Sequence, residues 1–261
     1  MLLVVDIGNT NTVLGVFNDN KLQFRYRVAT NLKRTSDELV ATLFNMFIIH
    51  GVSTKDIDDT IISSVVPDIM YSWQSCNRKI FDKEPIVVDY NTDTGIVIDY
   101  NSPSQVGSDR IVNAVAVHDK YGGPAIIVDM GTAITFDVIN KEGSYLGGSI
   151  APGIKIGQEG LFGMTAQLPK IELRNPTKAI ETNTPDSMNA GIVYGYIGLI
   201  DGIIGQIEKE YLCQHKDTEK INVIATGGYS GLISTESRYI DIIEPDRMLN
   251  GLKIIYDRIK K

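Results

Sequence analysis

The sequence predicts a three-layer α/β domain that occurs twice in the chain. Two segments share one pattern: LLVVDIGNTNT at residues 2–12 and AIIVDMGTAIT at residues 125–135. Each is a five-residue apolar segment that ends in Asp and continues as x-Gly-x-x-x-Thr. The two aspartates, Asp6 and Asp129, lie 123 positions apart in a chain of 261 residues. Self-similarity over about half a chain indicates a duplicated fold.

In each half, two further strands are expected after the repeated segment. VLGVFN at 13–18 and FDVIN at 136–140 read as the second strand of a hairpin, and KLQFRYRV and GSYLGGSI supply third strands. In the first of these third strands, apolar residues at 22, 24, 26 and 28 alternate with polar ones. This alternation is typical of a half-buried strand.

Helices and strands then alternate, which favours an α/β layer arrangement over a purely antiparallel one. A helix is predicted at about 36–50, capped by Ser36, with Leu39, Leu43 and Phe47 on one face. The remaining predicted elements are a strand at 60–66, a helix at 67–82, a strand at 84–89, a helix at 186–211, a strand at 221–226 and a helix near 246–260. The Gly-Gly-Pro in DKYGGP at 119–124 is a natural break, so we expect domains at 1–120 and 121–261.

Composition excludes several classes of partner. The chain has 25 Lys and Arg against 32 Asp and Glu, a net charge of −7, so we expect no nucleic-acid partner. Two cysteines and three scattered histidines are too few for a disulfide framework or a zinc site. The N-terminal MLLVVD reaches an acidic residue too soon for a signal peptide, and we expect a cytoplasmic protein.

One apolar stretch, residues 188–207, is long enough to span a bilayer. Its glycines at 191, 195, 198, 202 and 205 would line one face of a helix. Asp201 opposes a membrane span because a carboxylate near the middle costs about 2.5–3.5 kcal/mol on insertion scales. We therefore expect no membrane association, and a soluble helix packed on a sheet or on a partner helix.

The two Asp-ended turns are the candidate functional elements. Their glycines, Gly8 and Gly131, let the backbone approach a ligand, and the Asn and Thr side chains around them offer uncharged hydrogen-bond donors. A carboxylate does not attract phosphate directly, so Asp6 and Asp129 fit best as holders of a bridging cation. The alternative for either copy alone is that the Asp accepts bonds from its own turn. Two copies in register favour a phosphate clamp, with the turns facing each other across a cleft.

Together these features resemble the acetate and sugar kinase, Hsp70 and actin superfamily, and within it the type III pantothenate kinase family. The resemblance rests on six segments in order: DIGNTNT at 6–12, GSDR at 107–110, DMGTAITFD at 129–137, GGSIAPG at 147–153, LP at 168–169 and ETNTPDSM at 181–188. Two departures are small, since Ile134 and Ser108 stand where the family often has Thr. The resemblance implies two duplicated ribonuclease H-like (actin-like ATPase) domains with a cleft between them.

The resemblance also implies an activity: ATP-dependent phosphorylation of pantothenate at its primary hydroxyl, the first step toward coenzyme A. It implies Mg²⁺ with ATP, a monovalent cation (potassium or ammonium) and a homodimer whose substrate pocket the partner subunit partly completes. Asp109 matches the family's proton acceptor and Asp129 its monovalent-cation ligand. The matching ATP contacts are Asp6, Ile7, Gly8, Asn9, Thr10, Asn11, Thr12, Val13 and Thr132. The matching pantothenate contacts are Tyr100, Gly107, Ser108, Asp109, Arg110 and Thr184.

The chemistry accommodates these assignments. Phosphoryl transfer requires positioning, charge neutralisation and a carboxylate that takes the proton of the attacking hydroxyl. Arg110 suits a carboxylate substrate because a guanidinium can donate two parallel bonds to it. Each residue also has a structural alternative: an Asp109–Arg110 ion pair at a helix start, packing for Tyr100, and a helix cap for Thr184.

Other classes of function stay open at this point. A superfamily relative acting on another small substrate is opposed by the GSDR and ETNTPDSM segments. A non-enzymatic regulator would be favoured by loss of Asp6, Asp109 or Asp129, and all three are present. A filament-forming relative would carry larger insertions.

Overall fold

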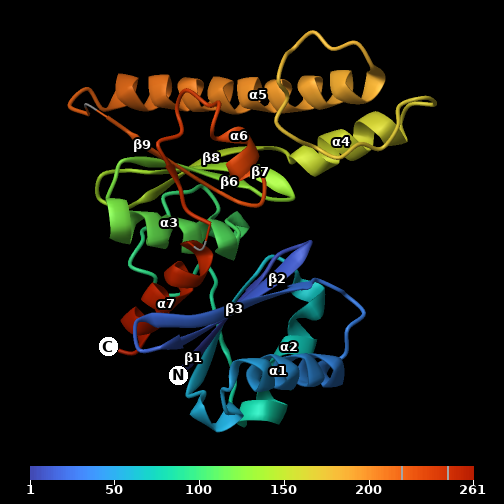
Figure 1. Ribbon diagram of the computed structural model, residues 1–261. Coiled ribbons are helices and arrows are strands. Elements are labelled where there is room, and N and C mark those ends of the chain that lie inside the picture. Colours follow the sequence, from blue (N-terminus) through green and yellow to red (C-terminus); the bar gives the residue numbers. More distant parts are fainter. Residues whose placement is uncertain (219, 246) are drawn as a thin grey trace. The chain divides into compact units, whose positions relative to one another are not determined.

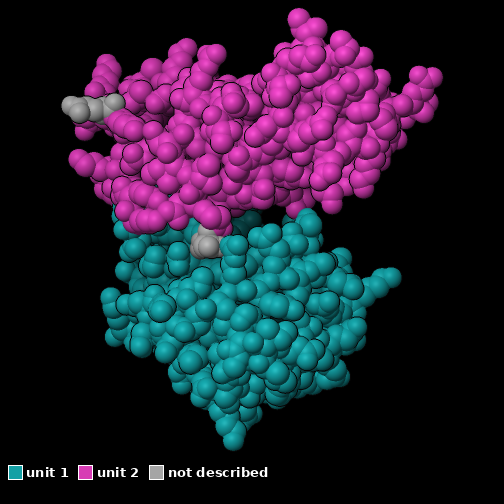
Figure 2. Space-filling view, viewed as in Figure 1, with its two compact units in different colours: residues 1–119, 247–261 teal, residues 120–246 magenta. Residues whose placement is uncertain are grey.

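The computed structural model describes residues 1–218, 220–245 and 247–261, and the chain divides into two compact units. Unit 1 comprises residues 1–119 and 247–261, and unit 2 comprises residues 120–246 (Figure 2). The C-terminal helix therefore belongs with the first half of the chain. The sequence assigned it to a domain at 121–261, and that assignment is wrong for this helix.

Unit 1 is built on one five-stranded sheet with the strand order β3-β2-β1-β4-β5. Its first three strands form an antiparallel meander, and β4 and β5 add in parallel to β1. The strands are β1 (Leu2–Ile7), β2 (Asn11–Asn18), β3 (Lys21–Ala29), β4 (Asp59–Ser64) and β5 (Ile86–Val87). The predicted alternation in β3 is confirmed, since every second side chain is more buried.

The two faces of β1 are covered by different helices (Figure 1). Leu3, Val5 and Ile7 lie in a core with residues of α1 (Ser36–His50) and α2 (Pro67–Phe81). Leu2 and Val4 point the other way, into a core with residues of α3 (Ser108–Tyr121) and α7 (Arg247–Ile259). Two short 3-10 turns, η1 (Thr54–Asp56) and η2 (Pro103–Gln105), complete the unit. The strand is thus buried on both sides, which fixes the position of its carboxyl end.

The predicted helix at 36–50 is confirmed, but its predicted cap is wrong by one residue. The cap is Thr35, whose hydroxyl accepts from the backbone N–H of Glu38 while the Glu38 carboxylate accepts from the backbone N–H of Thr35. This reciprocal capping box needs a Glu three residues after the cap. Thr35 has Glu38 at that spacing, and Ser36 has no such residue.

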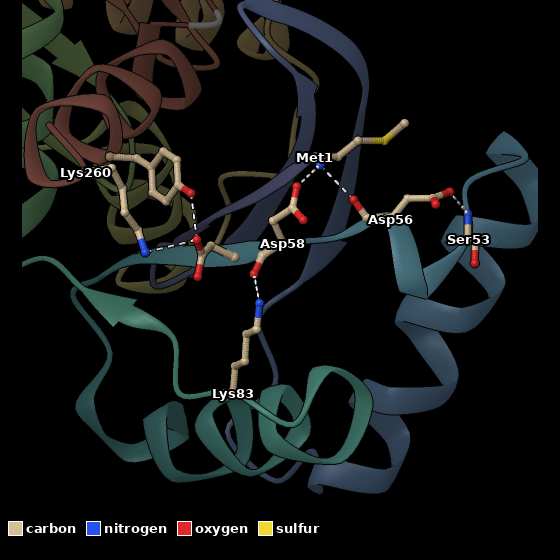
Figure 3. Close-up of polar contacts among 8 residues, drawn as sticks. Met1, Ser53, Asp56, Asp58, Lys83 and Lys260 are labelled. Atoms are coloured by element: carbon tan, nitrogen blue, oxygen red, sulfur yellow. Dashed lines mark hydrogen bonds and ion pairs between the residues drawn. The ribbon is translucent and has the colours of Figure 1, made fainter.

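The helix α7 is fixed to unit 1 by polar contacts as well as by its apolar face. The hydroxyl of Tyr256 donates to the carboxylate of Asp59 at 2.7 Å, and the ammonium of Lys260, which is labelled in Figure 3, lies 3.1 Å from the same carboxylate. Burial opposes ionisation of Asp59, but these two contacts outweigh it and hold the pKa of the carboxyl below its ordinary value. Next to it, the α-amino group of Met1 donates to the backbone oxygen of Asp56 and to the carboxylate of Asp58. Residue 246, in the predicted helix near 246–260, lies outside the described residues.

Unit 2 repeats the topology of unit 1. Its sheet has the order β10-β9-β6-β7-β8, with antiparallel β6–β7 and β7–β8 pairs and parallel β6–β9 and β9–β10 pairs. The strands are β6 (Ala125–Met130), β7 (Ala133–Ile139), β8 (Tyr145–Pro152), β9 (Asn222–Thr226) and β10 (Ile242–Ile243). Read from β8 to β10, this is the order of unit 1, so the duplication predicted from the repeat is confirmed. The helices are α4 (Ile154–Gly163), α5 (Thr184–Gln214) and α6 (Ser230–Ile233).

The long helix α5 buries one face only. Ile192, Val193, Ile200 and Ile204 pack with β6 residues in the core of unit 2. The glycines at 191, 195, 198 and 202 are exposed, and a Cβ added at any of them would meet nothing within 4 Å. The helix is long and apolar enough to cross a membrane, with 28% of its most apolar window buried, which by itself is weak evidence for a span. Asp201 accepts hydrogen bonds from Ser237 and from the backbone of Arg238, so its carboxylate joins α5 to the segment before β10 within unit 2.

Candidate functional site

The first Asp-ended segment forms a tight turn between β1 and β2. The backbone N–H of Gly8 donates to the carbonyl oxygen of Asn11 at 3.0 Å, and a Cβ at Gly8 would lie 3.1 Å from the same oxygen. The three residues at the tip, Asn9, Thr10 and Asn11, are exposed. The turn therefore presents backbone and polar side chains to a ligand, as an anion-binding loop requires.

Three predicted ATP contacts lie at the base of this turn rather than at its tip. Ile7 is fully buried and Val13 is half-buried, so both can offer only backbone groups. Thr12 is 1% exposed, and its hydroxyl is hydrogen-bonded to the hydroxyl of Thr30 at 2.9 Å. The Thr12 side chain therefore supports the turn from inside.

Thr30, just beyond β3, fastens this turn and was not predicted. Its hydroxyl donates to the carbonyl oxygen of Gly8 at 2.7 Å, and its backbone N–H donates to the carbonyl oxygen of Thr10 at 3.0 Å. With the contact to Thr12, a single residue holds the turn at three points. Thr30 belongs to no sequence motif. It lies beside the turn only because β3 pairs with β2.

The GSDR segment begins α3 beside the same end of the sheet. Ser63 and Ser64, at the end of β4, pair with Asp6 and Ile7 of β1. The hydroxyl of Ser108 contacts the hydroxyl of Ser63 at 2.9 Å and both the N–H and the C=O of Ser64 at 3.0 Å. The structure thus brings the GSDR segment and the strand end that carries Asp6 together within unit 1.

Asp109 follows directly, in the first turn of α3. Its carboxylate accepts a hydrogen bond of 2.8 Å from the backbone N–H of Arg110 and is partly exposed. A Cβ at Gly107 would lie 2.6 Å from this carboxylate, so a larger residue there would make the Asp109 side chain shift. Arg110 is 8% exposed, which is unusual for arginine and does not fit a solvated surface role. Tyr100, upstream of η2, is 37% exposed.

The second Asp-ended turn, in unit 2, is enclosed by glycines from two other segments. Asp129 is the next-to-last residue of β6 and lies opposite Thr135 of β7 and beside Thr226 of β9. A Cβ at Gly153 would lie 2.0 Å from the carbonyl oxygen of Thr132, so the GGSIAPG segment packs directly on the turn.

The turn that follows β9 also packs against the second Asp-ended turn. Gly227 has a left-handed φ of +94°, and a Cβ there would lie about 2.5 Å from backbone atoms of Met130. Thr132 itself is exposed, as a ligand contact must be.

Thr184 is the first residue of α5, and its side chain is exposed. It is not the helix cap, which lies one residue earlier. The cap is Asn183, whose side-chain oxygen accepts from the backbone N–H of Asp186. Hydrogen bonds from Asn183 and Arg174 hold the pKa of the Asp186 carboxyl below its ordinary value.

Among the described residues, no group of three or more His, Cys, Asp or Glu side chains could hold a metal ion. Mg²⁺ in nucleotide sites is commonly bound through one or two carboxylates, water and phosphate oxygens, so single carboxylates at each turn fit such an ion. Two cavities of about 390 and 400 Å³ lie in unit 1, and neither is lined by a predicted site residue.

Comparison with known proteins agrees with the fold. Several solved structures match nearly the whole chain, two of them as follows. One, from Campylobacter jejuni, is described as a conserved candidate Baf family transcriptional activator, with 19% identity, a TM-score of 0.60 and coverage of 99% of this chain and 100% of that one. The other is the (R)-2-hydroxyglutaryl-CoA dehydratase component A of Acidaminococcus fermentans, with 11% identity, a TM-score of 0.58 and coverage of 100% and 99%. At these identities the likeness concerns the fold alone.

Two duplicated α/β units, each with an Asp-ended turn after its first strand, define a protein of the actin-like ATPase and sugar kinase fold. The family model for type III pantothenate kinase matches residues 2–206. A type III pantothenate kinase of Finegoldia magna is 49% identical over 257 residues, 98% of this chain and 97% of that protein. The chain belongs to the type III pantothenate kinase family.

Proposed function

We propose that Asp109 is the general base of this kinase, which uses ATP to phosphorylate the primary hydroxyl of pantothenate in the first step of coenzyme A biosynthesis. The observation that supports this role is the Ser108 contact with β4. That contact holds the first turn of α3 beside the carboxyl end of β1, the strand that carries Asp6. A partly exposed carboxylate at such a position can accept a proton as the hydroxyl attacks.

The two Asp-ended turns are the proposed ATP contacts. In unit 1, the exposed Asn9, Thr10 and Asn11 offer N–H and side-chain donors, Gly8 lets the backbone approach the phosphates, and Ile7 and Val13 contribute backbone only. In unit 2, the exposed Thr132 is the corresponding donor. Uncharged donors on a glycine turn suit phosphate oxygens because they stabilise negative charge without a competing anion.

The proposed pantothenate contacts lie in the GSDR segment, at Tyr100 and at Thr184. Arg110 would bind the carboxylate of pantothenate, and its burial strengthens such a bond because the surrounding dielectric is low. Gly107 and Ser108 would contribute backbone groups, since the Ser108 hydroxyl is engaged with β4.

For the ions, we propose that Mg²⁺ is bound with ATP and that Asp129 holds a monovalent cation, potassium or ammonium. Both would neutralise charge on the phosphates. The absence of a dense carboxylate cluster among the described residues fits ions completed by water and phosphate oxygens.

We further propose a homodimer that packs through the exposed glycine face of α5, in the cytoplasm, with no membrane or nucleic-acid partner. An apolar helix with its glycines uncovered is suited to close approach of a second helix. A net charge of −7 disfavours nucleic acid and anionic lipid surfaces.

The test is phosphate transfer from ATP to pantothenate, with magnesium and potassium, by the wild type and by Asp109→Asn. We expect turnover in the wild type and a loss of at least about 100-fold in kcat in the variant, the size of a general-base contribution. Asp119→Asn, an exposed carboxylate toward the other end of α3, is the matched control and should retain full activity. Turnover in Asp109→Asn within tenfold of the wild type would remove Asp109 as base, and an inactive, folded wild type would overturn the function.

A further inference from the structure

We infer that Ser108 and Ser63 are positioning residues that hold Asp109 at the carboxyl end of β1, and that the Ser108 hydroxyl does not contact substrate. This inference rests on the proposed function, because it assigns the hydroxyl a task in placing the proposed base. It comes from the pattern of hydrogen bonds at one oxygen atom.

The Ser108 hydroxyl is fully engaged. A serine hydroxyl has one proton to donate and two lone pairs to accept with. Ser108 donates to the carbonyl oxygen of Ser64 and accepts from the backbone N–H of Ser64, both at 3.0 Å. Its proton is then committed, so in the 2.9 Å contact with Ser63 the Ser63 hydroxyl is the donor. Two acceptor sites and one donor are thereby filled, and nothing remains for a substrate.

Burial supports the same conclusion. Ser63 is 0% exposed and Ser108 is 7% exposed, so a ligand has little access to either hydroxyl. The neighbouring Asp109 is more accessible, as a group that meets substrate must be. The two adjacent residues of the segment therefore face different surroundings: one is bonded into the sheet and the other is partly open.

The place of the Ser108 hydrogen bonds in the sheet explains how they position Asp109. Ser63 and Ser64 are the β4 residues that pair with Asp6 and Ile7, and the backbone N–H of Val65 continues this pairing by donating to the carbonyl oxygen of Ile7. A bond from Ser108 to this strand end therefore fixes the start of α3 relative to the first Asp-ended turn. A misplacement of about 1 Å at a reacting group can cost about 100-fold in rate, so such a bond has a measurable effect on turnover.

The first experiment compares kcat and KM of Ser108→Ala, Ser108→Thr and Ser63→Ala with the wild type, using ATP and pantothenate. We expect Ser108→Ala to lower kcat by about 10- to 100-fold, with the KM for ATP changed less than about threefold. Ser108→Thr keeps the hydroxyl and should recover most of kcat. Ser63→Ala removes one of the three bonds and should give an intermediate loss. Ser104→Ala, an exposed serine four residues upstream, is the control and should match the wild type.

The second experiment measures amide hydrogen exchange without substrate, over residues 60–66 and 107–113. Ser108→Ala removes the acceptor of the Ser64 amide, so exchange in both segments should accelerate, whereas Ser104→Ala should change neither. This measurement tests the positioning even if the wild type failed to phosphorylate pantothenate, which would be a failure of the proposed function and not of the contact. Unchanged exchange in Ser108→Ala overturns the inference. So does a variant that keeps kcat and loses only affinity for pantothenate, since that is the signature of a direct substrate contact.

Discussion

The Thr30 hydroxyl and the Gly8 carbonyl oxygen, 22 positions apart in sequence, are joined by a 2.7 Å hydrogen bond in which Thr30 is the donor. This bond makes the shape of the first Asp-ended turn depend on the strand β3, which contributes none of the predicted ligand contacts.

Thr30→Val should therefore weaken ATP binding while leaving unit 1 folded. Valine has the same shape but loses the bonds to Gly8 and Thr12, each worth about 1 kcal/mol net. We expect the KM for ATP to rise at least about tenfold, because the two bonds together exceed the 1.4 kcal/mol that corresponds to a factor of ten. Thr42→Val is the matched control, since the Thr42 hydroxyl also donates to a backbone carbonyl, that of Glu38, at 2.8 Å. Equal KM values for the two variants would contradict the role of Thr30.

Gly153→Ala should disrupt the second Asp-ended turn. Its Cβ would lie 2.0 Å from the carbonyl oxygen of Thr132 and 2.8 Å from that of Gly131, and backbone cannot move aside cheaply. We expect a loss of at least about 2 kcal/mol in stability, typical of overpacking, together with a loss of activity. Gly160→Ala, inside α4 with nothing within 4 Å, should instead stabilise by about 0.5–1 kcal/mol. Thermal unfolding of the two variants gives the comparison, and similar melting temperatures would contradict it.

Replacing potassium by sodium at constant ionic strength should lower kcat if Asp129 holds a monovalent cation. In Asp129→Asn the potassium concentration for half-maximal rate should rise at least about tenfold, because the ligand loses its charge. Asp217→Asn, an exposed carboxylate of unit 2, should leave that concentration unchanged. A wild-type rate that is the same in both salts would remove the cation from the proposal.

Tyr256→Phe should destabilise unit 1 by about 1.5 kcal/mol at neutral pH, since a hydrogen bond to a charged carboxylate is lost. The pKa of Asp59 is lowered in the folded state, so its stabilisation is present above the unfolded pKa of about 3.9 and is lost as the pH falls through the folded value. The difference between wild type and variant should thus hold from pH 6 to 8 and shrink below about pH 4.

Urea unfolding monitored by tryptophan fluorescence measures this difference. Trp73 is the single tryptophan of the chain and lies in the core of unit 1, so the signal reports on that unit. A difference that stays constant down to pH 3 would mean that the Asp59 carboxylate is not the cause.

Gly195→Leu should convert the proposed dimer to a monomer. The added side chain would project from the exposed face of α5 and block close approach of a second helix, while leucine favours helix over glycine by nearly 1 kcal/mol. Light scattering at micromolar concentration should give twice 28.8 kDa for the wild type and 28.8 kDa for the variant. Glu210→Leu, exposed on the same helix but beyond its run of glycines, should stay dimeric.

Elements defined by local pattern could be predicted from the sequence. The two Asp-ended strands, the alternating β3 and the helix at 36–50 were expected within a few residues, because strand alternation and helical periodicity are properties of neighbouring residues. The helix cap was missed although its signal was present: Thr35 has Glu38 at the required spacing and Ser36 has no such partner.

What depends on long-range pairing could not be predicted in the same way. The apolar face of α7, with Leu249, Leu252 and Ile255, indicates a buried helix but does not say which sheet buries it. Thr30 and Ser63 belong to no motif, and they reach the candidate site only because β3 and β4 lie where the sheet order places them.

The return of α7 to unit 1 has a consequence for synthesis. Residues 120–246 form a continuous stretch, so unit 2 has all of its chain once residue 246 has left the ribosome. Unit 1 begins first, yet the face of β1 that carries Leu2 and Val4 is covered only by part of its core, including residues of α3, until Leu249, Leu252 and Ile255 emerge. The half of the protein that is translated first is therefore completed last, and its early strands must remain soluble in the meantime.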